Sequence, residues 1–346
     1  MSWSRFLPSA LALALSLVVP GSALVAQVSS DLSFPAYLQT LAAQARAQGV
    51  SDATVQRMIA GLTPNQKVID LDRAQPGGAV NGPSPPFAPY LRAHVDAERI
   101  AGGRRELAAA GSILPTIERE YGVPGPILLA IWGHESSYGG YQGDFDLIRS
   151  LATLAWEGRR RDLFAEEFIA LGKMIDRGVP ISRLRGSWAG AFGNPQFLPS
   201  VYLRIARDED HNGYADIWNS RADTLASIAN YFRDAGWRRG EPWGIAVNVP
   251  AGLDRSGYAT TLISPRCPRV FARHSQWRTM AEWRARGVMP QNGVWPADSV
   301  QATLLEPDGP GATAYLLTGN YRVILDYNCS NYYALSVGLL ADAIAR

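Results

Sequence analysis

The sequence predicts a mainly α-helical fold of the α+β class. Apolar residues recur at helical spacing from about residue 30 to about residue 244, and a further amphipathic segment closes the chain. Between them, two β-like runs flank an Asp-Gly-Pro-Gly turn at residues 308–311, which is a hairpin signal. The 346 residues are 47% apolar and 18% charged, as expected for a globular protein of one large or two smaller domains.

The first 26 residues are typical of a secretory signal peptide. One arginine precedes an apolar run from Phe6 to Val19, and small residues that suit cleavage after Ala23 or Ala26 follow. The run is shorter than the roughly 20 residues that a membrane span needs. No cysteine lies near the cleavage site, so we expect neither a lipid anchor nor another stable membrane anchor. The mature chain is therefore expected to be a soluble protein of the periplasm.

Residues 27–89 are expected to form an N-terminal helical region. Apolar residues at helical spacing indicate a first helix that ends near Gly49. Ser51 and Asp52 then suit the N-terminal cap of a second helix. Residues 73–90 are rich in proline and glycine, which predicts an extended ordered loop or linker.

Residues 90–245 repeat the helical pattern and are expected to form the main core. The predicted helices span residues 90–110, 111–121, 126–138, 147–157, 161–177, 199–206 and 221–236. Residues 246–320 are expected to form a small β-containing subdomain that includes the hairpin. The last segment, residues 321–346, begins with "YRVILDY", a candidate third strand or extended run. It ends in an amphipathic helix that completes the core.

Charge and cysteine content restrict the possible partners and chemistry. The net charge is +2, from 33 basic and 31 acidic residues, and no block is dominated by Lys or Arg. We therefore expect no nucleic-acid partner. Cys267 and Cys329 are the only cysteines, and a pair in an exported chain favours one disulfide over two unpaired thiols.

Glu135 stands on the apolar face of a predicted helix. That face begins at Leu128 with i, i+3 and i+4 spacing, and Glu135 follows it at i+7. The Gly139–Gly140 pair is expected to end the helix. A carboxylate that loses hydration on such a face has a raised pKa, which suits a general acid near neutral pH. The alternative is a glutamate at the helix end that turns to solvent or pairs with an arginine such as Arg159.

Two more carboxylates follow Glu135 closely. Asp144 or Asp146 could in principle supply the second carboxylate that ordinary glycosidases need. Each of them also suits a loop or a helix cap, and we favour that simpler interpretation.

Residues 208–219, "DEDHNGYADIWN", resemble a 12-residue calcium loop. The predicted ligands are Asp208, Asp210, Asn212, the backbone carbonyl of Tyr214, and Asp216. Hard oxygen donors at this spacing suit a structural Ca²⁺ rather than zinc. Asn219 stands where the loop pattern has a bidentate glutamate, so the alternative is a solvated acidic turn without metal.

Three other polar residues stand among apolar or aromatic neighbours. Ser187 and Gln196 belong to "GSWAGAFGNPQFLPSVY", whose small residues let a backbone or a ligand approach closely. Taken alone, this segment also fits tight packing with a surface serine. Asn328 precedes the last helix and suits an N-cap or a turn.

Together these motifs resemble the B-type family of lytic murein transglycosylases, enzymes that cleave peptidoglycan. The resemblance covers almost the whole mature chain. Six segments in the family's order carry it: "YGVPGPILLAIWGHES", "LATLAWEGRR", "GSWAGAFGNPQFLPS", the acidic loop, "SIANYFRDAGW" and "YNCSNYY". It implies a lysozyme-like helical core, no cofactor for the chemistry, and peptidoglycan glycan strands as the partner.

The resemblance also implies roles for single residues. Glu135 would be the catalytic acid, and a substrate groove would be lined by Ser187, Gln196, Tyr231, Tyr327 and Asn328. Arg159 and Arg160 match the family's paired arginines, which would contact the saccharide or its peptide carboxylates. His134 stands where an apolar residue is common, and we expect it to perturb the pKa of Glu135.

The implied reaction breaks the β-1,4 bond between N-acetylmuramic acid and N-acetylglucosamine and leaves a 1,6-anhydro end. One glutamate acts first as acid and then as base. Two alternatives are kept. A hydrolytic muramidase would use the same acid and add water, and a non-catalytic wall protein would bind peptidoglycan without cleaving it.

Overall fold

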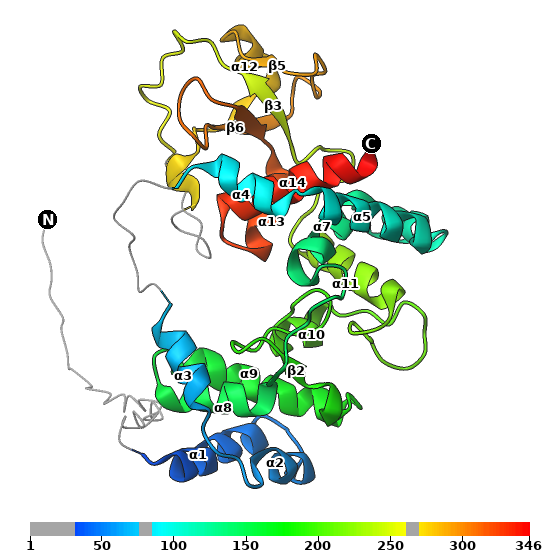
Figure 1. Ribbon diagram of the computed structural model, residues 1–346, viewed down its shortest axis with the longest axis vertical. Helices are drawn as coiled ribbons and strands as arrows, with labels where there is room; N and C mark the ends of the chain where they lie inside the picture. The colour runs from blue at the N-terminus through cyan, green and yellow to red at the C-terminus, as the bar shows by residue number, and fades with distance from the viewer. Residues whose placement is uncertain (1–31, 76–84, 261–269) are drawn as a thin grey trace, which may run out of the picture. The chain divides into compact units, whose positions relative to one another are not determined.

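The protein is described by a computed structural model covering residues 32–75, 85–260 and 270–346 (Figure 1). The predicted signal peptide at residues 1–26 and Cys267 lie outside these residues. Contacts gather Ser33–Arg346 into one unit, so the finer division suggested by the sequence stays a prediction. Within the described residues, no helix is both long enough and apolar enough to cross a membrane.

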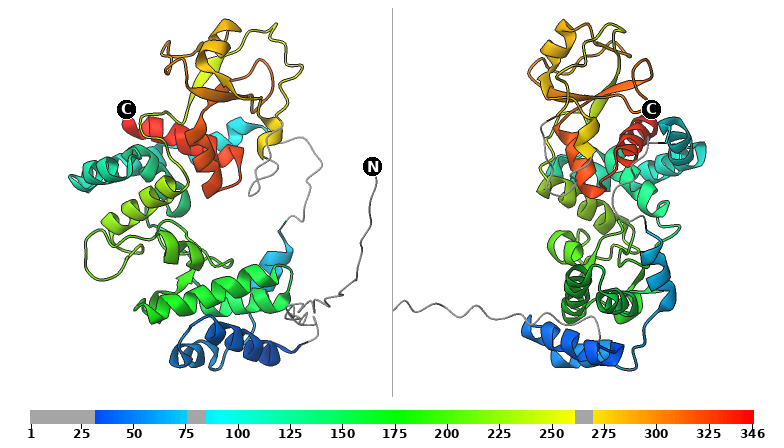
Figure 2. Two further views of the ribbon diagram at one scale, coloured as in Figure 1. Left: turned by 180° about the vertical axis from the view of Figure 1, so that it is seen from behind. Right: turned by 90° about the vertical axis from the view of Figure 1, so that its left-hand side faces the viewer.

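Helices dominate this part of the chain (Figures 1 and 2). In chain order they are α1 (Phe34–Ala47), α2 (Asp52–Ile59), α3 (Gln66–Arg73), α4 (Phe87–His94), α5 (Ala97–Ala110), α6 (Ile113–Tyr121), α7 (Gly125–Ser136), α8 (Leu147–Glu157), α9 (Arg161–Asp176), α10 (Pro199–Ile205), α11 (Arg221–Asp234), α12 (Met280–Ala285), α13 (Gly319–Tyr327) and α14 (Asn331–Ala345). Short 3-10 turns add η1 (Ile181–Arg183) and η2 (Val270–Arg273). The helices predicted between residues 111 and 236, and the C-terminal helix, are confirmed.

The N-terminal helices pack on the long pair α8 and α9. α1 buries the apolar face that its periodicity predicted and contacts α2, α8 and α9. The predicted cap of α2 is confirmed, because the Ser51 hydroxyl accepts a hydrogen bond from the Thr54 N–H. The Asp176 carboxylate at the end of α9 accepts the Ser51 hydroxyl at 2.7 Å, which fixes the cap to that helix.

The predicted helix over residues 90–110 is in fact two helices, α4 and α5. Val95 leaves the helical region, with φ −125° and ψ 55°. The Asp96 carboxylate then accepts a hydrogen bond from the Arg99 N–H and begins α5. Apolar periodicity missed this boundary because a cap is a local polar signal that does not interrupt the apolar pattern.

α7 is the central helix of the core. Its residues Ile127 to Trp132 are all buried, and it contacts α5, α6, α11 and α14. α8 and α9 lie side by side (Figure 2), and α9 also carries α10. The last turn of α7 is therefore held by helices from both the middle and the end of the chain.

A small antiparallel sheet follows the helices, with strand order β4-β6-β7-β3-β5. Its strands are β3 (Gly244–Asn248), β4 (Arg278–Thr279), β5 (Met289–Pro290), β6 (Gln301–Leu305) and β7 (Ala314–Leu317). The predicted hairpin is confirmed as β6 and β7, where Leu304 lies opposite Leu316. α12 packs Met280 and Trp283 into the same buried apolar cluster.

The prediction of a strand or extended run over residues 321–327 is wrong, because these residues belong to α13. The Thr318 hydroxyl accepts a hydrogen bond from the Asn320 N–H and begins the helix. Tyr321, Ile324 and Leu325 are buried at i, i+3 and i+4, which is the spacing of one helix face. Burial of that face outweighs the β-propensity of the sequence.

Candidate active site

Glu135 lies in the last turn of α7, where the chain turns sharply. Pro126 lies in the first turn of the helix, a position that suits proline. The helix ends at Ser136, before the glycine pair that was expected to end it. Ser137 and Tyr138 adopt left-handed conformations, with φ of 50° and 60°. Such conformations are costly for residues other than glycine, so the turn needs external support.

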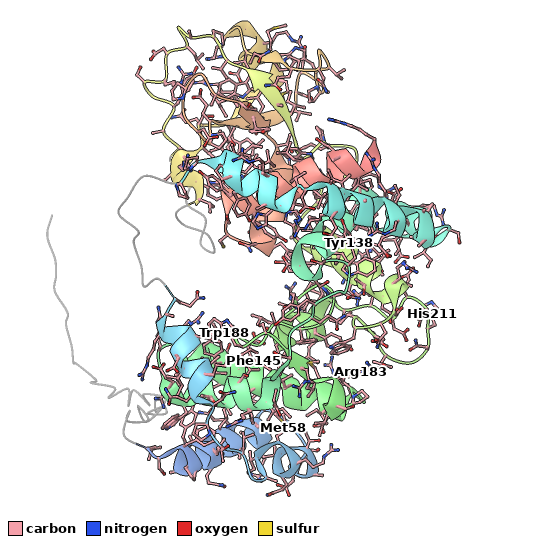
Figure 3. The ribbon with its side chains drawn as sticks, viewed as in Figure 1. Met58, Tyr138, Phe145, Arg183, Trp188 and His211 are labelled. Atoms are coloured by element: carbon pink, nitrogen blue, oxygen red, sulfur yellow. The ribbon has the colours of Figure 1, made fainter. Side chains whose placement is uncertain are left out.

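Tyr138, which Figure 3 labels, provides that support by packing against glycines. A Cβ atom placed on Gly102 of α5 would come within 2.6 Å of the Tyr138 ring, and one on Gly133 of α7 would come within 2.5 Å of its hydroxyl oxygen. The hydroxyl donates to the Arg99 carbonyl at 2.8 Å. The ring therefore occupies space that only these glycines leave, and it fixes the end of α7 to α5.

Glu135 is a half-buried residue, and its carboxyl group is hydrogen-bonded by one tyrosine. The Tyr333 hydroxyl on α14 donates to its Oε1 at 2.5 Å. Burial raises the pKa of Glu135 from 4.5 to about 7, while the Tyr333 hydrogen bond opposes part of this increase. The raised pKa expected from the sequence is thus explained by loss of hydration. The carboxyl group holds its proton near neutral pH.

His134 does not set the pKa of Glu135, contrary to expectation. Its Nδ1 donates to the Ala130 carbonyl at 2.9 Å, and its Nε2 lies 2.7 Å from the Ser336 hydroxyl oxygen. Burial lowers the pKa of His134 to about 3, so the ring is neutral. Burial and the Tyr333 hydrogen bond are the two causes that set the pKa of the Glu135 carboxyl group.

A tight loop that contains Ser187 and Gln196 is attached to the end of α7. Ser187 lies half-buried just after β2 (Arg185–Gly186), which pairs with β1 (Phe145–Asp146). Its hydroxyl accepts a hydrogen bond from the Ala191 N–H at 3.0 Å. Its own N–H donates to the Ala191 carbonyl at 2.7 Å. The hydroxyl hydrogen of Ser187 remains able to donate elsewhere.

The same loop is tied to the end of α7 through Asn194 and to the segment after α7 through Gln196. The Ser136 hydroxyl, next to Glu135, donates to the Asn194 carbonyl at 2.9 Å. The Gln196 amide donates to the carbonyl oxygens of Gln142 at 3.1 Å and of Gly193 at 2.9 Å. The Gln196 amide therefore holds the loop together. Gln196 itself is half-buried.

Tyr231 and Tyr327 contact this loop, and Asn328 follows Tyr327 in the chain. The rings of Tyr231 and Tyr327 meet edge to face with centroids 4.7 Å apart. The Tyr327 hydroxyl donates to the Pro195 carbonyl at 2.5 Å, and the charge of Glu135 raises its pKa, after burial as the larger cause. Asn328 is exposed. It ends α13, while Ser330 caps α14, so the interpretation of Asn328 as the N-cap of the last helix is wrong.

The residue after Asn328, Cys329, forms a disulfide.

Asp146, considered above as a second carboxylate, caps α8 by accepting the Arg149 N–H at 2.9 Å, and Asp144 is exposed. The simpler interpretation of Asp146 as a helix cap is thus confirmed.

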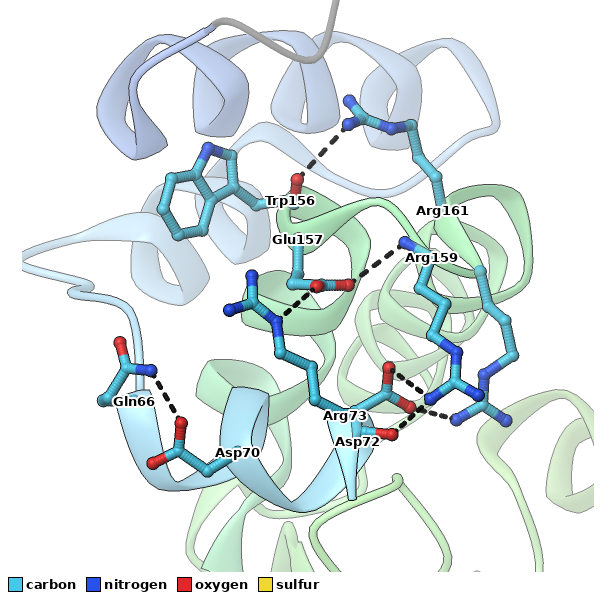
Figure 4. Close-up of polar contacts among 9 residues, drawn as sticks. Gln66, Asp70, Asp72, Arg73, Trp156, Glu157, Arg159 and Arg161 are labelled. Carbon is cyan, nitrogen blue, oxygen red and sulfur yellow. Dashed lines mark hydrogen bonds and ion pairs between the residues drawn. The ribbon is translucent and has the colours of Figure 1, made fainter. Parts of the chain in front are cut away.

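Arg159 and Arg160 lie between α8 and α9 and pair with Asp72 of α3 (Figure 4). Arg160 binds the Asp72 carboxylate, and Arg159 binds the Asp72 backbone carbonyl. No hydrogen bond or ion pair joins either arginine to α7 in the part of the chain that is described. The alternative that Arg159 pairs with Glu135 is therefore not realised.

The acidic loop brings Asp208 and Asp210 together with Asp223, which the loop pattern did not include. Carboxylate oxygens of the three lie within 4.8 Å of one another. They supply the hard oxygen donors that Ca²⁺ binds, so the donor set fits this ion. Asp216 accepts hydrogen bonds within the loop, including one from the Asn219 amide at 3.0 Å, as Asp208 and Asp210 also do. Asn212, Tyr214 and Asp216 stay predicted ligands.

Sequence reasoning missed three residues of these sites: Tyr333, Asp72 and Asp223. Tyr333 is 198 positions from Glu135, and nothing in its pattern separates it from an ordinary core aromatic residue. Asp223 lies in the first turn of α11, outside the 12-residue loop. The only sequence signal for Asp72 was an acidic residue among the apolar residues of a helical segment.

Known proteins share this architecture along most of the chain. The family described as "Transglycosylase SLT domain" matches residues 33–342. The membrane-bound lytic murein transglycosylase B of Escherichia coli is 29% identical over 283 residues, which are 80% of this chain and 73% of that protein.

Solved structures agree with this match. SltB3 of Pseudomonas aeruginosa, solved in complex with NAG-NAM-pentapeptide, is 39% identical with a TM-score of 0.81, covering 90% of this chain and 80% of that chain. The lytic transglycosylase Slt35 of Escherichia coli in complex with calcium is 27% identical with a TM-score of 0.71, covering 89% and 92%. The predicted mainly helical, lysozyme-like fold is confirmed. The chain therefore belongs to the transglycosylase SLT domain family, as its resemblance to the B-type lytic murein transglycosylases predicted.

Proposed function

We propose that this protein is a lytic transglycosylase that cleaves the glycan strands of peptidoglycan. The observation that carries the proposal is the carboxyl group of Glu135 at the end of α7, whose pKa is raised to about 7 by burial. Family membership supplies the substrate class, because SltB3 was solved with NAG-NAM-pentapeptide and with NAG-anhNAM-pentapeptide. The bond to be cleaved is the β-1,4 linkage from N-acetylmuramic acid to N-acetylglucosamine.

Glu135 acts first as a general acid. Its protonated carboxyl group donates a proton to the glycosidic oxygen, so that the leaving sugar departs as an alcohol. The positive charge that develops on the muramyl ring is stabilised by the substrate's own N-acetyl oxygen. Such substrate assistance removes the need for a second protein carboxylate. The positions of Asp144, exposed, and Asp146, at the cap of α8, agree with a one-carboxylate mechanism.

Glu135 then acts as a base. Its carboxylate takes the proton from the C6 hydroxyl of the same muramyl residue, and the freed oxygen bonds to C1. The product is a 1,6-anhydro end, and the proton returns to Glu135, so no water is consumed. The Tyr333 hydrogen bond stabilises the carboxylate formed between the two steps.

Seven further residues are proposed to form or support the substrate site. The Ser187 hydroxyl and the exposed Asn328 side chain would orient the N-acetyl group. Tyr231 and Tyr327 would form an apolar wall that excludes water, because their hydroxyls already donate to backbone carbonyls. Gln196 would hold the loop that carries Ser187. Arg159 and Arg160 would bind carboxylates of the substrate through charge-assisted hydrogen bonds.

The acidic loop is proposed to hold a structural calcium ion. Asp208, Asp210 and Asp223 would supply oxygen ligands, and Slt35 was solved in complex with calcium. The ion would stiffen the loop that precedes α11 and takes no part in the chemistry.

We further propose that the protein acts in the periplasm, where peptidoglycan lies. The N-terminal sequence supports this location, since it has the pattern of an export signal.

Product analysis tests the proposal. Purified murein sacculi are incubated with the wild-type protein and with Glu135→Gln, and the released fragments are analysed by mass spectrometry. The wild type is expected to release fragments that end in anhydromuramic acid, and the variant is expected to release none while still binding sacculi. Fragments one water heavier would indicate a hydrolytic muramidase. Binding without release by the wild type would indicate a non-catalytic wall protein.

A further inference from the structure

We propose that Asp72 is a positioning residue that fixes Arg159 and Arg160 as one receptor for a single carboxylate of the substrate. The proposal deepens the function proposed above and rests on it. Asp72 comes from the N-terminal helix α3, while the arginines lie between α8 and α9, so the receptor is assembled from two distant segments.

The Asp72 carboxylate is completely buried beneath the two arginines (Figure 4). Arg160 Nη2 binds its Oδ1, and Arg159 Nη1 lies 3.7 Å from its Oδ2. The side chains of Arg159 and Arg160 are 36% and 43% exposed. Each guanidinium group is thus anchored at one end and reaches solvent with the rest.

The backbone of the arginine pair is fixed as well. The Arg159 N–H donates to Glu157 Oε2 at 3.1 Å, and the other oxygen of Glu157 pairs with Arg73 Nε at 3.1 Å. The Arg160 guanidinium carbon lies 4.8 Å from the centre of the Phe164 ring. α3 therefore holds both the main chain and the side chains of the loop between α8 and α9.

This arrangement sets the charge that a ligand meets. Two adjacent guanidinium groups repel each other and together attract anions with more than one charge. The buried carboxylate offsets one of the two positive charges. Asp72, Arg159 and Arg160 together therefore carry one net positive charge, which matches one carboxylate of a ligand. Among the described residues, Nε and Nη2 of Arg159 and Nε and Nη1 of Arg160 have no hydrogen-bond acceptor, so both side chains keep donors for a ligand.

Docking of α3 alone does not account for a charge at this position. A buried carboxylate loses its hydration, and an apolar residue of similar size would dock a helix at least as well. One of its oxygens, Oδ2, is buried without a hydrogen-bond donor. The retained carboxylate is explained by its effect on the two arginines, whose orientation it determines.

The test compares two substrates and two variants. The substrates are soluble peptidoglycan strands and the same strands after their carboxylates are converted to methylamides. The variants are Asp72→Asn and, as a matched control, Asp70→Asn. Asp70 is an exposed residue of the same helix, and among the described residues its carboxylate accepts a hydrogen bond only from the Gln66 amide, at 2.8 Å. KM, kcat and the melting temperature are measured for each protein.

On native strands, Asp72→Asn is expected to raise KM about tenfold while kcat stays near the wild-type value, since binding weakens and the acid is untouched. Asp70→Asn is expected to match the wild type. On methylamide strands, Asp72→Asn and wild type are expected to have equal KM values. An unchanged KM on native strands, or an equal increase on both substrates, would overturn the proposal.

A second variant keeps the test decisive if Asp72→Asn does not fold. Arg160→Lys retains the positive charge and loses the fixed guanidinium contact to Oδ1. It is expected to raise KM on native strands and not on methylamide strands, and the absence of that difference would refute the receptor. If the wild type itself releases no anhydro fragments, the proposed function fails instead, so the two failures are distinguishable.

Discussion

Replacing Glu135 with glutamine is expected to stabilise the folded protein above pH 7 but not near pH 4. The reason is the raised pKa of the Glu135 carboxyl group, about 7 in the folded chain against 4.5 when hydrated. Below pH 4.5 this carboxyl group is protonated in both the folded and the unfolded chain. Between pH 4.5 and 7 it ionises only when the chain unfolds, so the wild type loses stability as pH rises. Glutamine does not ionise and lacks this loss.

The size of the effect follows from the same two pKa values. A change from 4.5 to about 7 corresponds to about 3 kcal/mol at roughly 1.4 kcal/mol per tenfold change in proton affinity. Glu135 is half-buried, and water at its exposed side reduces the figure. The compared quantity is the free energy of unfolding of Glu135→Gln minus that of the wild type. We expect this difference to be about 1–3 kcal/mol larger at pH 8 than at pH 4.

Urea unfolding from pH 4 to pH 8.5 measures this difference directly. Most other titrating groups are common to both proteins, so their contributions cancel in the comparison. Glu166→Gln serves as the control, because Glu166 is an exposed carboxylate on α9 and its side chain is hydrated in both states. If the difference in free energy of unfolding between Glu135→Gln and the wild type stays constant across this pH range, the raised pKa of Glu135 is refuted.

Three further outcomes are expected. Tyr333→Phe removes the donor that lowers the pKa of Glu135, so the alkaline limb of the kcat/KM profile should move to higher pH, and an unmoved limb would contradict the contact. Asp223→Asn should reduce the increase in melting temperature that millimolar calcium gives the wild type, and equal increases would argue against Asp223 as a ligand. Gly133→Ala would bring a Cβ within 2.5 Å of the Tyr138 hydroxyl oxygen, so it should lower the free energy of unfolding by about 1–3 kcal/mol in urea. Alanine normally stabilises a helix interior relative to glycine, and a stabilised variant would contradict that packing.

Short-range sequence patterns predicted the helices, caps and turns that depend on residues close together in the sequence. The apolar spacing from Leu128 was enough to place α7 and Glu135. The Ser51 cap and the β6–β7 hairpin were predicted for the same reason, because a cap and a tight turn depend on a few adjacent residues.

Contacts between distant segments could not be predicted in that way. Tyr333 reaches Glu135 only because α14 packs on α7. Asp72 reaches the arginines only because α3 packs on α8. The error over residues 321–327 has the same origin, since their β-branched residues favour a strand until burial against the core decides for a helix.

The most direct test of the central claim is the mass of the fragments that the wild type and Glu135→Gln release from murein sacculi. If one glutamate donates and then recovers a proton while the sugar closes on itself, the wild-type fragments end in anhydromuramic acid and the variant releases none. Wild-type fragments that have gained a water molecule, or a variant as active as the wild type, would contradict it.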